Sequence, residues 1–216
     1  MFRIILIVCL LMIGCAKKKE EINKVVQQPS LDAPLGASNS DETNSDTLWV
    51  DNVNSNIQWI GRKFTGEHSG RVKVAGGYIV KNDNQLKGGE ILINMNSITV
   101  DDIENPRSNQ SLVDHLKDDD FFNVEKYPTA KFVFNDFKGK DDNTSVSGIM
   151  TIRDKSVQTN FLLNVVVDSD SSYTTGTVNI DRSKFGIKYK SKSFFSDLGD
   201  RFIYDEFTLN FKILAR

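Results

Sequence analysis

Residues 115–137 read HLKDDDFFNVEKYPTAKFVFNDF. This stretch joins the end of a helix to an acidic turn, an aromatic pair and an alternating strand. We expect Leu116, Phe121 and Phe122 to seat the helix on a sheet, because burial stabilises large apolar side chains. Pro128 restricts its own backbone and that of the residue before it, so it should direct the chain into the following strand. The stretch therefore predicts a helix packed against β structure.

The helix begins upstream of this stretch, at Asn105 and Pro106. Asn is a favoured N-cap residue, and Pro is well tolerated at the first helical position. The apolar residues that then share one helix face are Leu112, Val113 and Leu116. The pattern stops at Lys117, and a second short helical turn is expected at residues 193–198. Helix signals are otherwise sparse, which indicates a mostly β protein.

The last strand of the chain shows the clearest alternation of apolar and polar side chains. Its apolar set is Phe207, Leu209, Phe211 and Ile213. Similar alternation occurs in residues 90–96 and 156–167. In residues 71–80 the set expected on the inward face is Val72, Val74, Tyr78 and Val80. Because side chains alternate between the two faces of a strand, each segment predicts a strand with one buried face.

Short turn-forming segments separate these strands. Residues 82–84, 138–143 and 168–172 are rich in Gly, Asn, Asp and Ser. Connections this short favour antiparallel hairpins, because parallel strands need a much longer crossover. About eight strands in roughly 170 residues suit either a closed barrel or a sandwich. The alternation itself does not choose between the two.

The first fifteen residues have the layout of an export signal. A basic start is followed by an apolar run from Ile4 to Ile13 and then by Gly14-Cys15. This run is too short to cross a bilayer, which takes about twenty residues. Residues 11–15, LMIGC, resemble a bacterial lipobox, in which the cysteine is lipid-modified. The pattern predicts a signal peptide at residues 1–14 and lipid attachment at Cys15; an ordinary signal peptide whose cysteine has no role is the alternative.

The next segment, residues 15–47, is polar and predicts a flexible tether behind the lipidated cysteine. A folded domain is expected at residues 48–216. Cys9 leaves with the signal peptide, so the mature chain keeps no thiol for a disulfide, a thiolate metal site or a nucleophile. We therefore expect an exported protein in the cell envelope, attached to a membrane and facing the periplasm or the cell surface.

The charged and metal-binding side chains exclude several classes of function. A net charge of −2 and a pI near 5.8 argue against binding nucleic acid. Two distant histidines without a partner cysteine do not predict a metal site, and no cofactor is expected. One catalytic hypothesis remains: a small envelope hydrolase or isomerase in which His115 is a general base beside Asp114 or Asp120.

The apolar content has two interpretations that residue types leave open. The 14 Phe residues either fill a core or line a space for one elongated apolar ligand. Strand parity selects the candidate lining residues, which are Phe132, Phe134, Phe161, Leu163, Phe207, Leu209 and Phe211.

Four motifs, in order along the chain, resemble those of the YceI-like family. They are NSITVD at 96–101, DHLKDDDFFNVEKYPTA at 114–130, GIMTIR at 148–153 and DRSKFGI at 181–187. The resemblance implies a lipocalin-like, extended antiparallel eight-stranded β-barrel with one or two short helices. It also implies export to the envelope, and it transfers no catalytic residue.

In that family the interior holds an amphiphile such as a polyisoprenoid or a fatty acyl chain. The resemblance thus suggests a non-enzymatic envelope lipoprotein that binds an isoprenoid quinone or polyprenyl chain for carriage or buffering, with Cys15 on the membrane. A structural envelope module with a filled interior is the alternative. Whether the protein is a monomer or a homodimer stays open.

Overall fold

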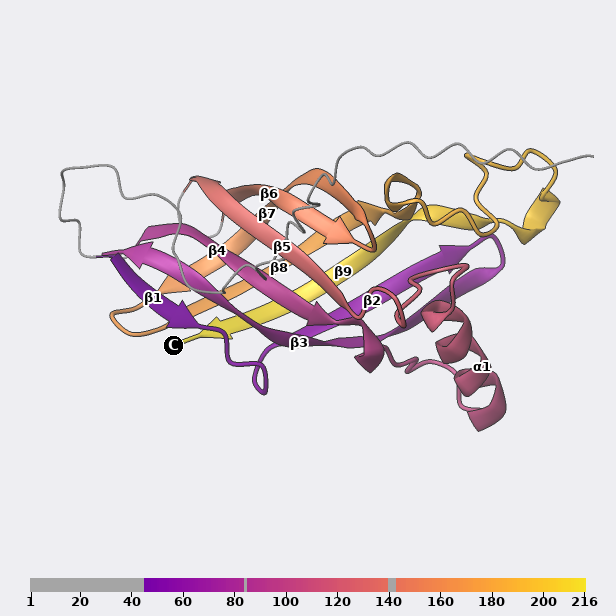
Figure 1. Cartoon of the computed structure of the whole chain (residues 1–216), viewed down its shortest axis with the longest axis horizontal. Coiled ribbons are helices and arrows are strands. Elements are labelled where there is room, and N and C mark those ends of the chain that lie inside the picture. Colours follow the sequence, from indigo (N-terminus) through magenta and orange to yellow (C-terminus); the bar gives the residue numbers. More distant parts are fainter. Residues whose placement is uncertain (1–44, 84, 140–142) are drawn as a thin grey trace, which may run out of the picture. The chain divides into compact units, whose positions relative to one another are not determined.

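The computed structural model describes residues 45–216 except 84 and 140–142 (Figure 1). The predicted signal peptide, Cys15 and nearly all of the tether lie outside the described residues, so these assignments stay predictions. The first strand begins at Ser45, slightly before the domain start expected at Leu48. The described residues belong to one compact unit.

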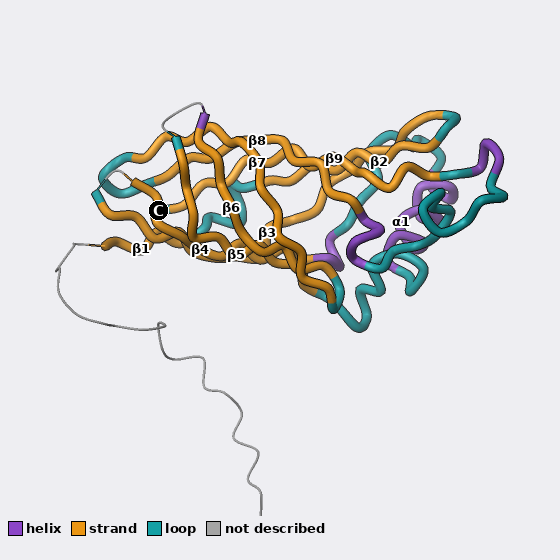
Figure 2. The backbone as a smooth tube through the Cα atoms, turned by 90° about the horizontal axis from the view of Figure 1, so that it is seen from above, coloured by secondary structure: helices purple, strands orange, loops and turns teal. Residues whose placement is uncertain are grey.

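Eight strands close into an antiparallel barrel, as the sequence resemblance implied. The described strands are β1 (Ser45–Trp49), β2 (Asn56–Lys63), β3 (Gly66–Asn82), β4 (Gln85–Asn94), β5 (Thr129–Lys138), β6 (Thr144–Ile152), β7 (Lys155–Val167), β8 (Ser172–Asp181) and β9 (Ile203–Ala215). Their order around the ring is β3-β2-β9-β8-β7-β6-β5-β4, and β4 pairs with β3 to complete it (Figure 2). This closure confirms the barrel over the sandwich.

Strands β1 and β2 share one position in the wall. β2 pairs with the first half of β3 and with β9, whereas β1 pairs with the second half of β3. Val50, just after β1, bridges to Ala215 at the end of β9. The slot between β3 and β9 is therefore filled by two consecutive segments, and β1 extends the wall beyond β2.

A bulge in β3 reverses which side chains face inward. The register against β4 shifts between Val74 and Gly76. One extra residue in a strand exchanges its two faces from that point on. Ile79 is consequently buried, whereas Tyr78 is 37% exposed and Val80 is half-buried. The prediction that Tyr78 and Val80 share the inward face with Val74 was wrong, because a uniform alternation does not include a bulge.

The two ends of the barrel differ. The connections β3–β4, β5–β6 and β7–β8, each short in sequence, join their strands at one end, which we call the hairpin end. At the opposite end, the helix end, the chain leaves the wall to form helix α1 (Pro106–Lys117) between β4 and β5 and the long connection 182–202 between β8 and β9 (Figure 1).

Helix α1 follows the prediction closely. The Asn105 side chain accepts a hydrogen bond from the Ser108 backbone N–H at 3.0 Å, and Pro106 is the first helical residue. Val113 and Leu116 are buried on the face toward the barrel. The residues that the structure describes include no helix with both the length and the apolar character needed to cross a bilayer.

The second helical turn lies later than expected. A hydrogen-bonded turn does occur at residues 192–194, where the N–H groups of Phe194 and Phe195 donate to the Ser191 oxygen, but the helical residues lie later, in a short 3₁₀ turn at Gly199–Arg201. The Ser193 hydroxyl donates a hydrogen bond to the Asp205 carboxylate at 2.6 Å. This contact ties Ser193 to β9.

Candidate functional site

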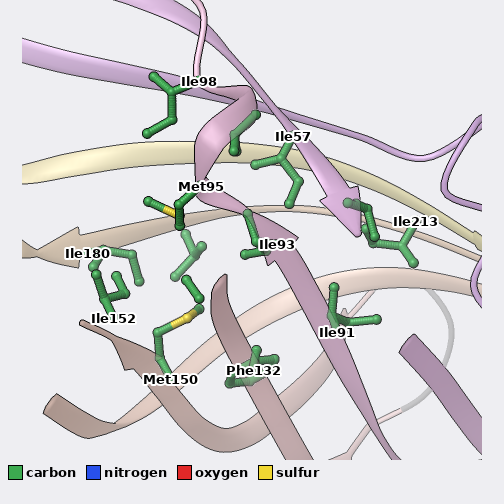
Figure 3. Close-up of a cluster of buried hydrophobic side chains, with 14 of the residues drawn as sticks. Ile57, Ile91, Ile93, Met95, Ile98, Phe132, Met150, Ile152, Ile180 and Ile213 are labelled. Carbon is green, nitrogen blue, oxygen red and sulfur yellow. The ribbon is translucent and has the colours of Figure 1, made fainter. Parts of the chain in front are cut away.

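Two apolar chambers lie inside the barrel. The hairpin-side chamber has a volume of about 80 Å³ and the helix-side chamber about 100 Å³. Ile93, Met150 and Leu209 line both of them, so the chambers adjoin. Figure 3 shows Ile93 and Met150 among the buried side chains that converge there from different strands. The interior is thus divided into two neighbouring spaces along the barrel.

All seven lining residues chosen by strand parity lie on these chambers. Those on the hairpin-side chamber are Phe132, Phe134, Phe161, Leu163, Leu209 and Phe211. Phe207 lines the helix-side chamber, as Leu209 also does. The structure therefore brings the whole set together in the barrel interior, while their contact with a ligand stays a prediction.

A row of Phe rings lines the hairpin-side chamber. Phe134 stacks on Phe132 with ring centroids 5.4 Å apart, and Phe132 lies 5.3 Å from Phe161. Phe161 in turn contacts Phe211 edge to face at 5.6 Å. Such aromatic pairs add attraction beyond the burial of area alone. The rings link β5, β7 and β9 along the inner face of the wall, over the intervening strands β6 and β8.

Glycines in the wall leave room for these rings. A methyl group added at Gly148 of β6 would lie 2.7 Å from the Phe132 ring and 2.4 Å from a backbone oxygen of β5. At Gly176 of β8 it would lie 2.5 Å from the Phe211 ring. All three distances are shorter than a van der Waals contact. The absence of a side chain at these two positions therefore lets the rings lie flat against the wall.

The end of helix α1 and the segment that follows it close the helix-side chamber. Leu116, Phe121 and Phe122 all line it, and Phe122 contacts Phe207 at 6.4 Å. Met95, in a 3₁₀ turn after β4 (Met95–Ser97), lines the same space. The prediction that Leu116, Phe121 and Phe122 seat the helix on the barrel is confirmed. The same three side chains close the interior at the helix end.

Choosing lining residues from the alternation within each strand missed some of the residues that line the chambers. Aliphatic residues of the same inward faces complete the hairpin-side chamber, among them Ile57, Ile79, Ile91, Val146, Met150, Val178 and Ile213. The selection favoured Phe, although the same alternation marks most of these positions. Ile79 was missed for a different reason, because it follows the bulge in β3.

Arg182 is a buried cation that sequence reasoning did not assign a role. Its guanidinium lines the helix-side chamber and donates hydrogen bonds to the backbone oxygens of Tyr204, Ile187 and Ile203 at 3.0–3.2 Å. Nη2 also lies 3.2 Å from Oδ1 of Asp205. Burial lowers the pKa of Arg182 below its ordinary value, and the charge of Asp205 opposes that change. With these partners Arg182 ties the connection 182–202 to β9.

His115 has no carboxylate beside it among the described residues. Its ring packs edge to face on Tyr189 at 4.5 Å and on Phe121 at 5.0 Å, and Nε2 is buried without a hydrogen-bond partner. Asp114 instead accepts a hydrogen bond from Gln110. Among the described residues His115 therefore packs the end of helix α1, without the oriented carboxylate that a general base uses.

The other histidine belongs to a polar pair that no sequence pattern predicted. His68 Nδ1 lies 2.8 Å from the carboxylate of Asp102, which also accepts a hydrogen bond from the Ser69 backbone N–H. Partial burial of Asp102 disfavours its charged form, yet the hydrogen bonds from Ser69 and His68 prevail and lower its pKa. The pair lies on the surface at the helix end and outside the chambers.

Comparisons with known proteins agree with this architecture. A family profile described as YceI-like domain matches residues 49–215. BcnA of Burkholderia cenocepacia superposes with a TM-score of 0.62 at 18% identity, over 77% of this chain and 99% of that chain. A polyisoprenoid binding domain from Saccharophagus degradans, implicated in plant cell wall breakdown, gives 0.57 at 12% identity, over 78% and 97%. At these identities the likeness concerns the fold, and no curated protein gave a significant match.

Proposed function

Because this chain belongs to the YceI-like family, we propose that its barrel binds one elongated amphiphilic lipid, of the polyisoprenoid or fatty-acyl type. The observation that carries the proposal is the pair of adjoining apolar chambers inside a closed wall. The role is binding for carriage or buffering, without catalysis. One solved structure with this fold is described as a polyisoprenoid binding domain, which supports the choice of ligand class.

The physical basis of binding is removal of an apolar chain from water. Each Å² of apolar surface that is buried contributes about 25 cal/mol. Apart from Thr174, the hairpin-side chamber is lined by Leu, Ile, Val, Met and Phe side chains. Such side chains also make up most of the helix-side lining, where Arg182 is the charged member. The two spaces adjoin at Ile93, Met150 and Leu209, so a linear tail could pass from one to the other.

The empty interior is smaller than such a tail. Chambers of about 80 and 100 Å³ are each below the roughly 150 Å³ of an engineered cavity that admits benzene. Binding therefore requires interior side chains to move, and the row of Phe rings is the natural element to do so. Phe161 and Phe211 are only partly buried, which leaves them freer to rotate than Phe132 and Phe134.

The proposal is tested with the full chain purified from membranes. Lipid extraction and mass spectrometry should identify a co-purifying amphiphile, and added isoprenoid quinone should bind. Leu163→Trp fills the hairpin-side chamber and should abolish binding, whereas Leu162→Trp places the same ring on the exterior, where Leu162 is 60% exposed, and should not. If no lipid co-purifies and none binds, the interior is a packed core and the structural-module alternative holds.

We further propose that lipid on Cys15 attaches the protein to a membrane of the cell envelope. The support is the sequence alone, since Cys15 lies outside the described residues. Cys15→Ser should move the protein from the membrane fraction to the soluble one and abolish labelling with radioactive palmitate. Labelling that persists in the variant would contradict the assignment.

A further inference from the structure

Lys81 is a cation on the inward face of the barrel wall. The bulge in β3 turns it inward together with Ile79, and its side chain is 3% exposed. Its neighbour across the ladder on β4 is Leu86, which lines the hairpin-side chamber. Paired residues of adjacent strands point to the same face of a sheet. Lys81 therefore lies beside Leu86 at the hairpin end of the barrel, next to the apolar hairpin-side chamber.

The ammonium group of Lys81 is weakly paired for a buried charge. Its contacts within the described residues are the Asp83 backbone oxygen and the Asp46 carboxylate, both at 3.3 Å. The Asp46 side chain is 51% exposed, so water shares its charge. An ammonium has three donors, and strong charge-assisted bonds are shorter than these two contacts. Counted over the described residues, Lys81 thus keeps capacity for a further anionic partner.

Two unpaired hydroxyl groups occur at the same end of the barrel. Ser172 and Thr174, near the start of β8, are buried, and their hydroxyls have no hydrogen-bond partner among the described residues. Thr174 lines the hairpin-side chamber. Buried polar groups in proteins are nearly always hydrogen-bonded, so unsatisfied ones point to a partner that binds there.

The buried cation at the other end differs in this respect. Arg182 already donates to three backbone oxygens and is ion-paired with Asp205. Little of its donor capacity is left for a ligand. The interior thus has a saturated cation at the helix end and an under-used one at the hairpin end, which gives the barrel a direction.

We propose that Lys81 receives the head group of the bound amphiphile and that this head is anionic, a carboxylate or a phosphate. The apolar tail extends through the hairpin-side chamber, past the unpaired hydroxyl of Thr174, toward the helix-side chamber. This inference rests on the proposed lipid-binding function and adds to it the charge of the head and the orientation of the ligand.

Two pairs of probes separate the head from the tail. Farnesyl phosphate and farnesol share an isoprenoid tail, and dodecanoate and dodecanol share an acyl tail. Binding to the full chain is measured by isothermal titration calorimetry at constant ionic strength. We expect the anionic member of at least one pair to bind at least about tenfold more tightly than the neutral member, the size of one charge-assisted hydrogen bond. A preference in the farnesyl pair indicates a phosphate head group, and a preference in the dodecyl pair indicates a carboxylate.

Three variants then assign the preference to Lys81. Lys81→Gln should reduce the anionic-to-neutral ratio to about one, with neutral binding changed less than about twofold. Asp46→Asn removes the competing carboxylate and should keep or raise the ratio. Lys87→Gln, on the exposed face of the same hairpin, is the matched control and should change nothing.

The outcomes separate this inference from the proposed function. Neutral and anionic probes that bind equally to the unmodified protein overturn the inference and leave lipid binding intact. A ratio that falls in Asp46→Asn as it does in Lys81→Gln shows that the ion pair has only a structural role. If Lys81→Gln fails to fold, the test rests on the anionic-to-neutral affinity ratio of the unmodified protein and of Asp46→Asn. The inference stands if that ratio is at least about ten in the unmodified protein and is kept or raised in Asp46→Asn, and it is overturned otherwise. If no probe binds, both proposals fail.

Discussion

Phe161→Ala should weaken the empty barrel and strengthen its response to lipid. The Phe161 ring is partly buried, and it touches Phe132 and Phe211 across the hairpin-side chamber. Truncating a fully buried Phe costs about 3–5 kcal/mol of unfolding free energy, so this half-buried ring should cost about 2–3 kcal/mol. For a domain of this size that lowers the melting temperature by roughly 4–12 °C.

A bound lipid should restore part of that loss. In the unmodified protein the tail must displace the Phe161 ring from its neighbours, whereas in the variant the space is already open. Ligand at about 100 times its Kd stabilises a protein by about 2.7 kcal/mol, and tighter binding adds more. The difference in melting temperature between variant and unmodified protein should therefore shrink when farnesol is added.

The assay is thermal unfolding followed by circular dichroism, with and without farnesol. Leu162→Ala is the control, because Leu162 is adjacent on β7 and 60% exposed, and it should change stability by less than about 0.5 kcal/mol in either condition. The reasoning is refuted if farnesol stabilises neither protein, or if it leaves the gap between them unchanged. Either result would mean that Phe161 is a packing residue only.

Three further predictions concern the wall, the buried cation and the surface pair. Gly148→Ala should lower the free energy of unfolding by about 1–3 kcal/mol in urea titrations, because the added methyl meets the Phe132 ring and a backbone oxygen. Arg182→Met should cost about 3–5 kcal/mol in the same measurement, since it leaves the Asp205 charge and three backbone oxygens without their partner. The Asp102 pKa is lowered from 3.8, so the folded state binds its proton less readily than the unfolded state. Its stabilising effect, at most about 1 kcal/mol at this half-exposed site, should be present above pH 3.8 and disappear as the pH falls below that, and Asp102→Asn should remove this dependence.

The period-two pattern of the sequence predicted the inward faces of most strands correctly. Phe207, Leu209 and Phe211 were assigned from alternation on β9, and all line the interior. Alternation is reliable because it follows from the geometry of an extended backbone and needs no knowledge of neighbouring strands. The helix start at Asn105 was equally local, since one side chain and the following turn define an N-cap.

Where the backbone departs from regular geometry, the pattern failed. The bulge before Gly76 changes the inward set of β3 and brings Lys81 into the interior, where a search for apolar periodicity does not look for a charge. The pairing of His68 with Asp102 was likewise hidden, because the two residues meet only once the segment after β4 lies beside β3.

The sequence by itself determined the class of the fold, the apolar character of the interior and, through four ordered motifs, the family. Each of these is a property of single segments. A strand with alternating apolar side chains must bury its apolar face in any arrangement that forms a core. Only the tertiary structure decided that the sheet closes between β3 and β4, that the Phe rings form one row on the inner wall, and that the two chambers adjoin. It also decided that Lys81 lies buried at the hairpin end of the barrel. These features depend on register and contact between strands far apart in the chain, which local periodicity does not record.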